Sequence, residues 1–171
     1  MDDKHSPGAD ERSPICLSFL AKLGRTPDKA GRQAILSACI KVRSPWVEEL
    51  LWEALADPNE CVRDLVSREL SLRRPLALGL ALRRLRLPPW FARSAALRII
   101  GHQRVREAVP EIRRTIDDAN ADVRRAAAEA LSEIGGEEAL RLLVRLKKDA
   151  NPYVRAAAEE AIRKTSGVRF S

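Results

Sequence analysis

The chain has 171 residues, with 31 Lys or Arg and 24 Asp or Glu, so its formal charge is +7. With 45% hydrophobic and 32% charged residues, it can bury a sizeable core, which excludes a disordered tail. No run approaches the ~18–20 uncharged apolar residues of a membrane span, and the polar segment Met1–Ser13 does not resemble a signal peptide.

Apolar residues at helical spacing indicate helices throughout, and no segment alternates as a strand does. Residues 1–13 and 166–171 are expected to be mobile tails around a single domain, 14–165. Pro45 and Pro75 are expected in first helical turns, whereas Gly24, Gly101 and Gly135 are expected where helices end. In chain order, the helices expected outside the repeated motif described below are Pro14–Leu23, Trp46–Ala56, Leu76–Leu87, Val105–Asp117 and Glu137–Lys148. The last expected helix, Pro152–Lys164, is a lone copy of that motif.

A unit of about 31 residues repeats along the chain. Its marker is an arginine, and the spacings between successive copies are 31, 30, 31 and 31 residues. The marker arginines are Arg32, Arg63, Arg93, Arg124 and Arg155, and seven residues after them stand Cys39, Leu70, Ile100, Leu131 and Ile162. Steps of seven return to one helix face, so each arginine begins a first helix whose apolar stripe is buried. A second helix follows in each unit, which predicts about four hairpins with a half unit at each end.

Each marker arginine lies at the edge of the buried stripe, where a charge needs an internal partner. In three copies an aspartate stands six residues earlier, in the turn before the helix, and we expect it to be that partner. The sequence therefore predicts a structural ladder of Asp57 with Arg63, Asp118 with Arg124, and Asp149 with Arg155.

The pattern resembles the HEAT-like repeat of the short bacterial kind found in bilin lyases, Asp-x-x-x-x-Val-Arg followed by Ala-Ala-x-x-Ala-Leu-x-x-Ile-Gly. The best copy runs from Asp118 to Gly135, and the resemblance covers residues 26–165. Leu87 and Thr26 replace the aspartate in the third and first copies. The resemblance implies an all-α, right-handed α/α superhelix of about four to five hairpins and about ten helices. It also implies that second helices line the concave face.

Few residues of the sequence are candidates for a catalytic role. Cys16, Cys39 and Cys61 form no C-x-x-C pair, which favours a reducing cytoplasm over a disulfide framework, and Cys39 falls at a core position. His5 lies in the expected tail and His102 in an expected loop, with no histidine–carboxylate pattern. We therefore expect no catalytic residue, metal site, cofactor or small-molecule substrate.

A basic series stands out on the second helices. Arg83, Arg114 and Arg145 are each 31 residues apart, and Arg141 and Lys148 lie near the last. Such a series is ordinarily explained by charged side chains that face solvent on the outer side of a helix. The functional alternative is that the arginines form a stripe that binds a partner. The functional hypothesis is a cytoplasmic, non-enzymatic scaffold that binds an acidic partner protein through these five residues.

Two other classes stay open. The same stripe suits sequence-independent nucleic-acid binding, although acidic residues are interspersed with the basic ones. A bilin-lyase-like or DNA-glycosylase-like enzyme is less favoured, because the chain is short for either. Trp46 and Trp52, six residues apart, also lie ~240° apart around a helix and cannot form one aromatic face.

Overall fold

The computed structural model describes residues 13–167, which form ten α-helices, one short 3-10 turn and no strand. Except for Ser13, Ser166 and Gly167, the expected tails lie outside the described residues, as does His5. The helices are α1 (Pro14–Arg25), α2 (Lys29–Ile40), α3 (Pro45–Ala54), α4 (Glu60–Leu72), α5 (Leu78–Leu85), α6 (Trp90–His102), α7 (Val109–Thr115), α8 (Ala121–Ile134), α9 (Glu137–Leu146) and α10 (Pro152–Gly167).

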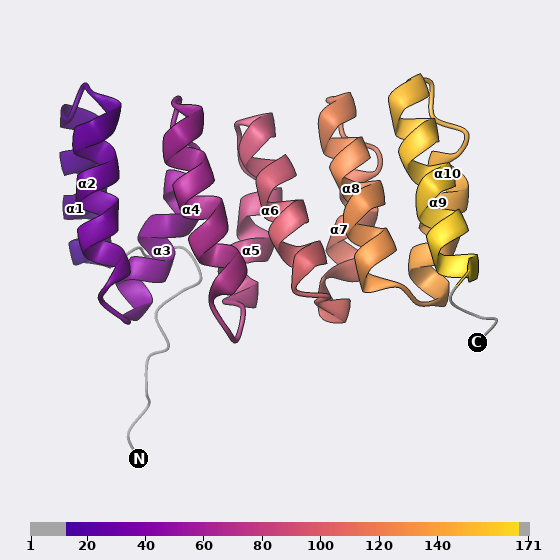
Figure 1. The fold of residues 1–171 in the computed structure, drawn as a ribbon, viewed down its shortest axis with the longest axis horizontal. Helices are drawn as coiled ribbons and strands as arrows, with labels where there is room; N and C mark the ends of the chain where they lie inside the picture. Colours follow the sequence, from indigo (N-terminus) through magenta and orange to yellow (C-terminus); the bar gives the residue numbers. More distant parts are fainter. Residues whose placement is uncertain (1–12, 168–171) are drawn as a thin grey trace, which may run out of the picture.

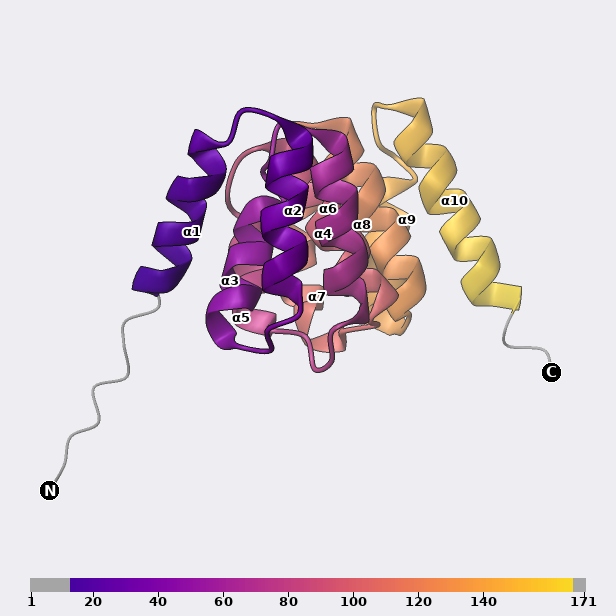
Figure 2. The ribbon, with the colours of Figure 1, turned by 60° about the vertical axis from the view of Figure 1, so that its left-hand side comes forward.

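The helices stack in two rows along one axis, as the sequence predicts for an α solenoid (Figure 1). The first helices, α2, α4, α6, α8 and α10, form one row in which each packs against the next. The second helices, α1, α3, α5, α7 and α9, form the row behind it (Figure 2). Because each hairpin shares its apolar faces with both neighbours, equivalent side chains come into line along the stack.

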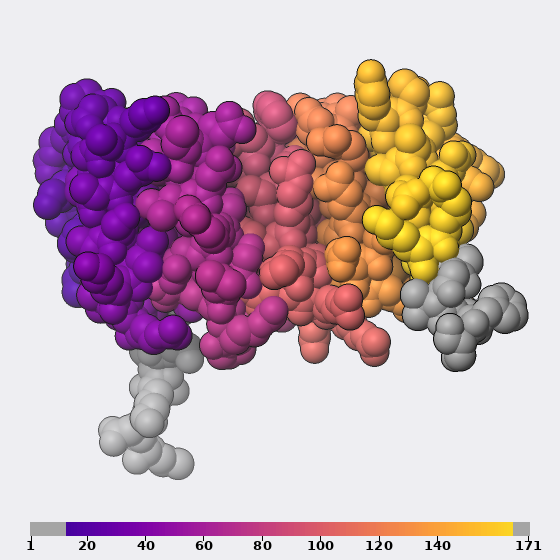
Figure 3. Space-filling view, in the orientation of Figure 1, coloured from indigo at the N-terminus to yellow at the C-terminus, as the bar shows by residue number. Residues whose placement is uncertain are grey.

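The core lies between the two rows and is almost wholly aliphatic. The largest fully buried side chains include Leu36, Leu50, Leu97 and Leu131, and Cys39 is buried among them as expected. Burial raises the pKa of the Cys39 thiol, so it packs as a small hydrophobe. On the outside, the first helices form one continuous face from end to end (Figure 3).

Small residues set the distance between α6 and α8. Ala126, Ala127, Ala128 and Ala130 of α8 are all buried. Gly101 is buried as well, and a Cβ there would lie 2.7 Å from the Cα of Ala130. The prediction that Gly101 ends its helix is therefore wrong, because α6 continues to His102 and the glycine serves the close approach of two helices.

Several helix boundaries differ from expectation. Gly24 lies inside α1, and Pro75 lies in the loop before a shorter α5. The helix expected from Val105 starts instead with a 3-10 turn, Arg106–Ala108, before α7. Gly135 does end α8 as predicted, with φ of 68°, in the left-handed region that favours glycine.

Candidate interaction surface

The ladder joins neighbouring units. Each marker arginine is the fourth residue of its first helix, which places its guanidinium beside the turn of the following unit. Arg124 donates from Nε and Nη2 to the two carboxylate oxygens of Asp149, at 2.7 and 3.0 Å. Arg93 binds Asp118 in the same way, at 2.8 and 3.0 Å, and Arg32 Nε lies 2.9 Å from an Asp57 oxygen.

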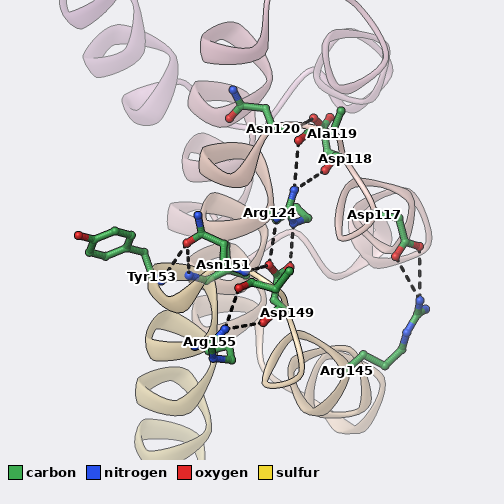
Figure 4. A network of polar contacts seen from close by, with 12 residues as sticks. Asp117, Asp118, Ala119, Asn120, Arg124, Arg145, Asp149, Asn151, Tyr153 and Arg155 are labelled. Atoms are coloured by element: carbon green, nitrogen blue, oxygen red, sulfur yellow. Dashed lines mark hydrogen bonds and ion pairs between the residues drawn. The ribbon is translucent and has the colours of Figure 1, made fainter.

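The prediction that each aspartate carboxylate pairs with the arginine of its own unit is therefore wrong, because the carboxylate binds the arginine of the preceding unit. In the three units that have an aspartate six residues before the arginine, that aspartate accepts through its main-chain carbonyl oxygen, not its carboxylate. Arg63, Arg124 and Arg155 donate from Nη1 to the carbonyl oxygens of Asp57, Asp118 and Asp149, at 2.8 to 2.9 Å. Figure 4 shows the contacts of Arg124 and Arg155. Each carboxylate is thereby free to bind the arginine 25 residues earlier, as Asp149 binds Arg124.

Each ladder aspartate also shapes its own turn. Asp149 accepts from the backbone N–H of Asn151 at 2.8 Å, and the Asn151 side chain caps α10 by accepting from the Tyr153 N–H (Figure 4). The hydrogen bond from Arg124 holds the pKa of Asp149 below its usual range and raises that of Arg124. One carboxylate thus ties a turn, a helix start and the preceding unit together.

Two marker arginines have no aspartate partner among residues 13–167. Arg155 belongs to α10, the last of the described helices, and no described residue lies 25 positions after it. For Arg63 the equivalent turn holds Leu87 and Pro88. There the ring of Phe91 stacks on the guanidinium instead, with its centroid 4.4 Å from the central carbon of Arg63.

The predicted basic stripe lies on the second helices, where ion pairs link one helix to the next. Arg83 of α5 donates to Glu53 of α3 at 3.0 Å, and its side chain is only 22% exposed. Arg145 of α9 donates to Asp117, which follows α7, at 3.3 Å, but this pair is well exposed. Arg83 is thus largely committed to the scaffold, whereas Arg145 presents its charge to solvent.

Glu111 is a residue of this surface that the sequence analysis did not identify. Buried on α7, it accepts two hydrogen bonds of 2.8 Å from Arg86 and two from Arg114 Nη1, at 3.0 and 3.3 Å. The hydrogen bond from Arg86 lowers the pKa of Glu111. One carboxylate is shared by two arginines, which leaves this group of three side chains with a net positive charge. Glu111 follows Arg86 by 25 residues, the step that joins the ladder, and that spacing could have revealed it.

Four arginines gather between α7 and α9, where Arg141 also pairs with Glu137 at 2.9 Å. Two adjoining hollows of about 470 and 480 Å³ open there and share Arg113, Glu138 and Arg145 in their linings. Arg141 and Arg114 each line one of them, and Asp117 lines the second, so four arginines face two acidic residues. Of the predicted partner-binding residues, Arg114, Arg141 and Arg145 line these hollows and exposed Lys148 lies just after α9, whereas Arg83 lies on α5 and lines neither hollow.

A third hollow, of about 420 Å³, lies over α8 between α6 and α10 on the first-helix face. Its charged side chains neutralise one another, as in Arg98 with Glu129 and Lys164 with Glu160. His102 on its rim is the exposed last residue of α6, not a loop residue as expected. No cluster of three histidine, cysteine or acidic side chains suited to a metal occurs within residues 13–167.

The tryptophans do not converge on a base-binding plate. Trp46 stacks on Phe19 with ring centroids 5.0 Å apart, and Trp52 is buried in the core. Trp90 alone of the three is substantially exposed, and it lies at the start of α6.

No helix in the described part of the chain is both long and apolar enough to cross a membrane.

Comparisons with known proteins agree with this architecture. A search of curated proteins finds no match to the sequence. The family model for HEAT repeats matches residues 77–163, which span α5 to α10 and all the ladder rungs after Arg63. With half of its length matched by that model, the chain belongs to the HEAT repeat family.

Proposed function

We propose that this chain is a non-enzymatic scaffold that binds an acidic segment of a partner protein across the hollows between α7 and α9. HEAT repeats indicate a protein-interaction scaffold, and the observation that supports this particular surface is its lining of four arginines against two acids. The binding residues are Arg113, Arg114, Arg141 and Arg145, with Lys148 at the edge.

The scaffold contributes rigidity as well as charge. Arg114 is oriented by its 3.0 Å hydrogen bond to Glu111, which is itself fixed by Arg86 on the neighbouring helix. Arg145 reaches back from α9 to Asp117, so the two helices present their guanidinium groups at a set separation. Side chains already ordered before binding lose less entropy on binding, which favours an extended acidic peptide.

A fluorescent twelve-residue peptide of alternating Glu and Gly, followed by anisotropy, tests the proposal. Reversing Arg113 and Arg145 to glutamate should weaken binding about 10–100-fold, because each lost contact with a carboxylate contributes roughly 0.5–1 kcal/mol and each reversal adds repulsion. Reversing Arg104 and Arg163, which are exposed on first helices and their ends, changes net charge equally and should weaken binding less than threefold. Equal losses in both variants would show that net charge alone attracts the peptide, and would overturn the proposal.

Nucleic acid is the second candidate, favoured by the formal charge of +7. Glu138 and Asp117 in the lining repel phosphate groups as they repel the carboxylates of an acidic peptide, so salt dependence is the property that separates the two ligands. Titrating duplex and single-stranded DNA at 50 and 200 mM salt separates the classes. Tight DNA binding at low salt that falls by orders of magnitude at the higher salt would favour nucleic acid over the acidic protein segment.

A further inference from the structure

A rung of the ladder is the contact between a marker arginine and the carboxylate of the next unit, and the rung of Arg63 lacks that carboxylate. The unit between Arg63 and Arg93 is one residue shorter than the others, so counting back from Arg93 gives Leu87 and counting forward from Arg63 gives Pro88. Arg63 is nevertheless held in the ladder position, because its Nη1 donates to the carbonyl oxygens of Asp57 and Pro58 at 2.8 and 2.9 Å. Among residues 13–167, no acidic side chain forms an ion pair with Arg63.

The other rungs show what this side of the guanidinium binds. Arg32 and Arg124 donate from Nη1 to the turn before their own helix, as Arg63 does, and place Nε and Nη2 on the carboxylate of the next unit. Arg63 therefore presents the same Nε and Nη2 edge. Arg63 is half-buried, and neither nitrogen is fully enclosed without a hydrogen-bond partner, so this edge keeps some contact with solvent.

Aromatic residues fix and extend the open rung. Phe91 covers one face of the Arg63 guanidinium, which leaves its edge clear and restrains its plane. Trp90 meets Phe91 edge-on with ring centroids 5.8 Å apart, and 42% of Trp90 is exposed. The Arg63 guanidinium thus stacks on Phe91, and Phe91 in turn contacts the exposed ring of Trp90; aromatic residues and arginine are enriched at protein-binding surfaces.

We propose that the open rung, defined as Arg63, Phe91 and Trp90, is a docking point for an aspartate or glutamate side chain of a partner protein. The incoming carboxylate takes the place that Asp149 takes beside Arg124. A planar carboxylate with two oxygens matches the fork of Nε and Nη2, and the complete rungs show that match in this fold. The proposal does not depend on the surface between α7 and α9, which lies on the second helices.

The arginine Nε–H resonances of the uniformly ¹⁵N-labelled full chain test it, with the peptide acetyl-Leu-Asp-Gly-amide as probe. The Nε resonance that disappears in Arg63→Gln should shift saturably with peptide, while those of Arg93 and Arg124, whose forks are occupied, should move less than a fifth as far. The same peptide with Asn for Asp should produce no saturable shift. If the Arg63 resonance does not shift, or responds equally to the Asn peptide, the proposal is wrong.

Matched variants at position 87 separate the vacant rung from general attraction. Leu87→Asp supplies an internal carboxylate and should weaken peptide binding at least tenfold, whereas Leu87→Asn, equal in size but neutral, should leave it within threefold. Arg63→Lys keeps the charge without the fork and should also lose at least tenfold. Equal binding by the two position-87 variants, or retention of binding by Arg63→Lys, would overturn the proposal, as would inorganic phosphate binding as tightly as the peptide.

Discussion

Two adjacent aspartates should differ sharply in their effect on stability. Asp118 accepts two hydrogen bonds from Arg93, at 2.8 and 3.0 Å, and one from the Asn120 N–H at 2.9 Å. Both side chains of this ion pair are largely buried, 18% and 12% exposed. Asp117 meets Arg145 at 3.3 Å, with both side chains more than half exposed.

Asp118→Ala should therefore cost about 2–3 kcal/mol of unfolding free energy, because it leaves a mostly buried guanidinium and a turn N–H without their acceptor. For a chain of this length that is roughly 5–10 °C in Tm. Asp117→Ala removes the same charge from an exposed pair and should cost about 0.5 kcal/mol or less.

Urea unfolding followed by circular dichroism, with both variants at one pH and ionic strength, measures the difference. The two substitutions alter net charge identically, so a general charge effect cancels between them. Losses within about 0.5 kcal/mol of each other would refute the reasoning that burial and turn geometry, and not charge, decide what each aspartate contributes.

Other predictions concern packing and pH. Gly101→Ala should cost about 1–3 kcal/mol in urea unfolding, because its Cβ would lie 2.7 Å from the Ala130 backbone; an unchanged midpoint would contradict the close approach of α6 and α8. Leu131→Ala should cost about 2–5 kcal/mol, since Leu131 is fully buried, and a smaller loss would place it outside the core. Since Arg124 lowers the pKa of Asp149 in the folded state, stability should be complete above the unfolded value of about 3.9 and fall as pH drops below it. Asp149→Asn should flatten that fall, and an unaltered acid profile would remove Asp149 as its source.

The stack of helical hairpins could be predicted from the sequence because the repeated residues are those whose positions are constrained by packing. The step between Arg124 and Arg155 and the apolar residue seven places on, such as Leu131, both follow from one buried helix face. Helix ends were less predictable. Gly135 adopts the left-handed conformation of a glycine that terminates a helix. Gly101 also lies near the end of a first helix, but there the lack of a side chain allows the close approach of the neighbouring helix α8.

Pairing partners were the harder part of the site. Arg124 has two candidate ladder aspartates, Asp118 six residues before it and Asp149 25 residues after it, and the sequence does not show which one presents its carboxylate. The stacking of units decides it, by placing the turn of Asp149 beside the N-terminal turn of α8. Likewise, a 31-residue register finds Arg83, Arg114 and Arg145 but not the acids that meet them, because Glu111 stands outside that register.

Arg32, Arg93 and Arg124 are each bound to the carboxylate of the following unit, and these contacts hold the units in a stack with equivalent side chains in line. A double-mutant cycle measures this directly, with Arg124→Met combined with Asp149→Asn and, separately, with Asp118→Asn. We expect a coupling energy of about 1–2 kcal/mol between Arg124 and Asp149, and less than about 0.5 kcal/mol between Arg124 and Asp118. Stronger coupling to Asp118 than to Asp149 would contradict the account.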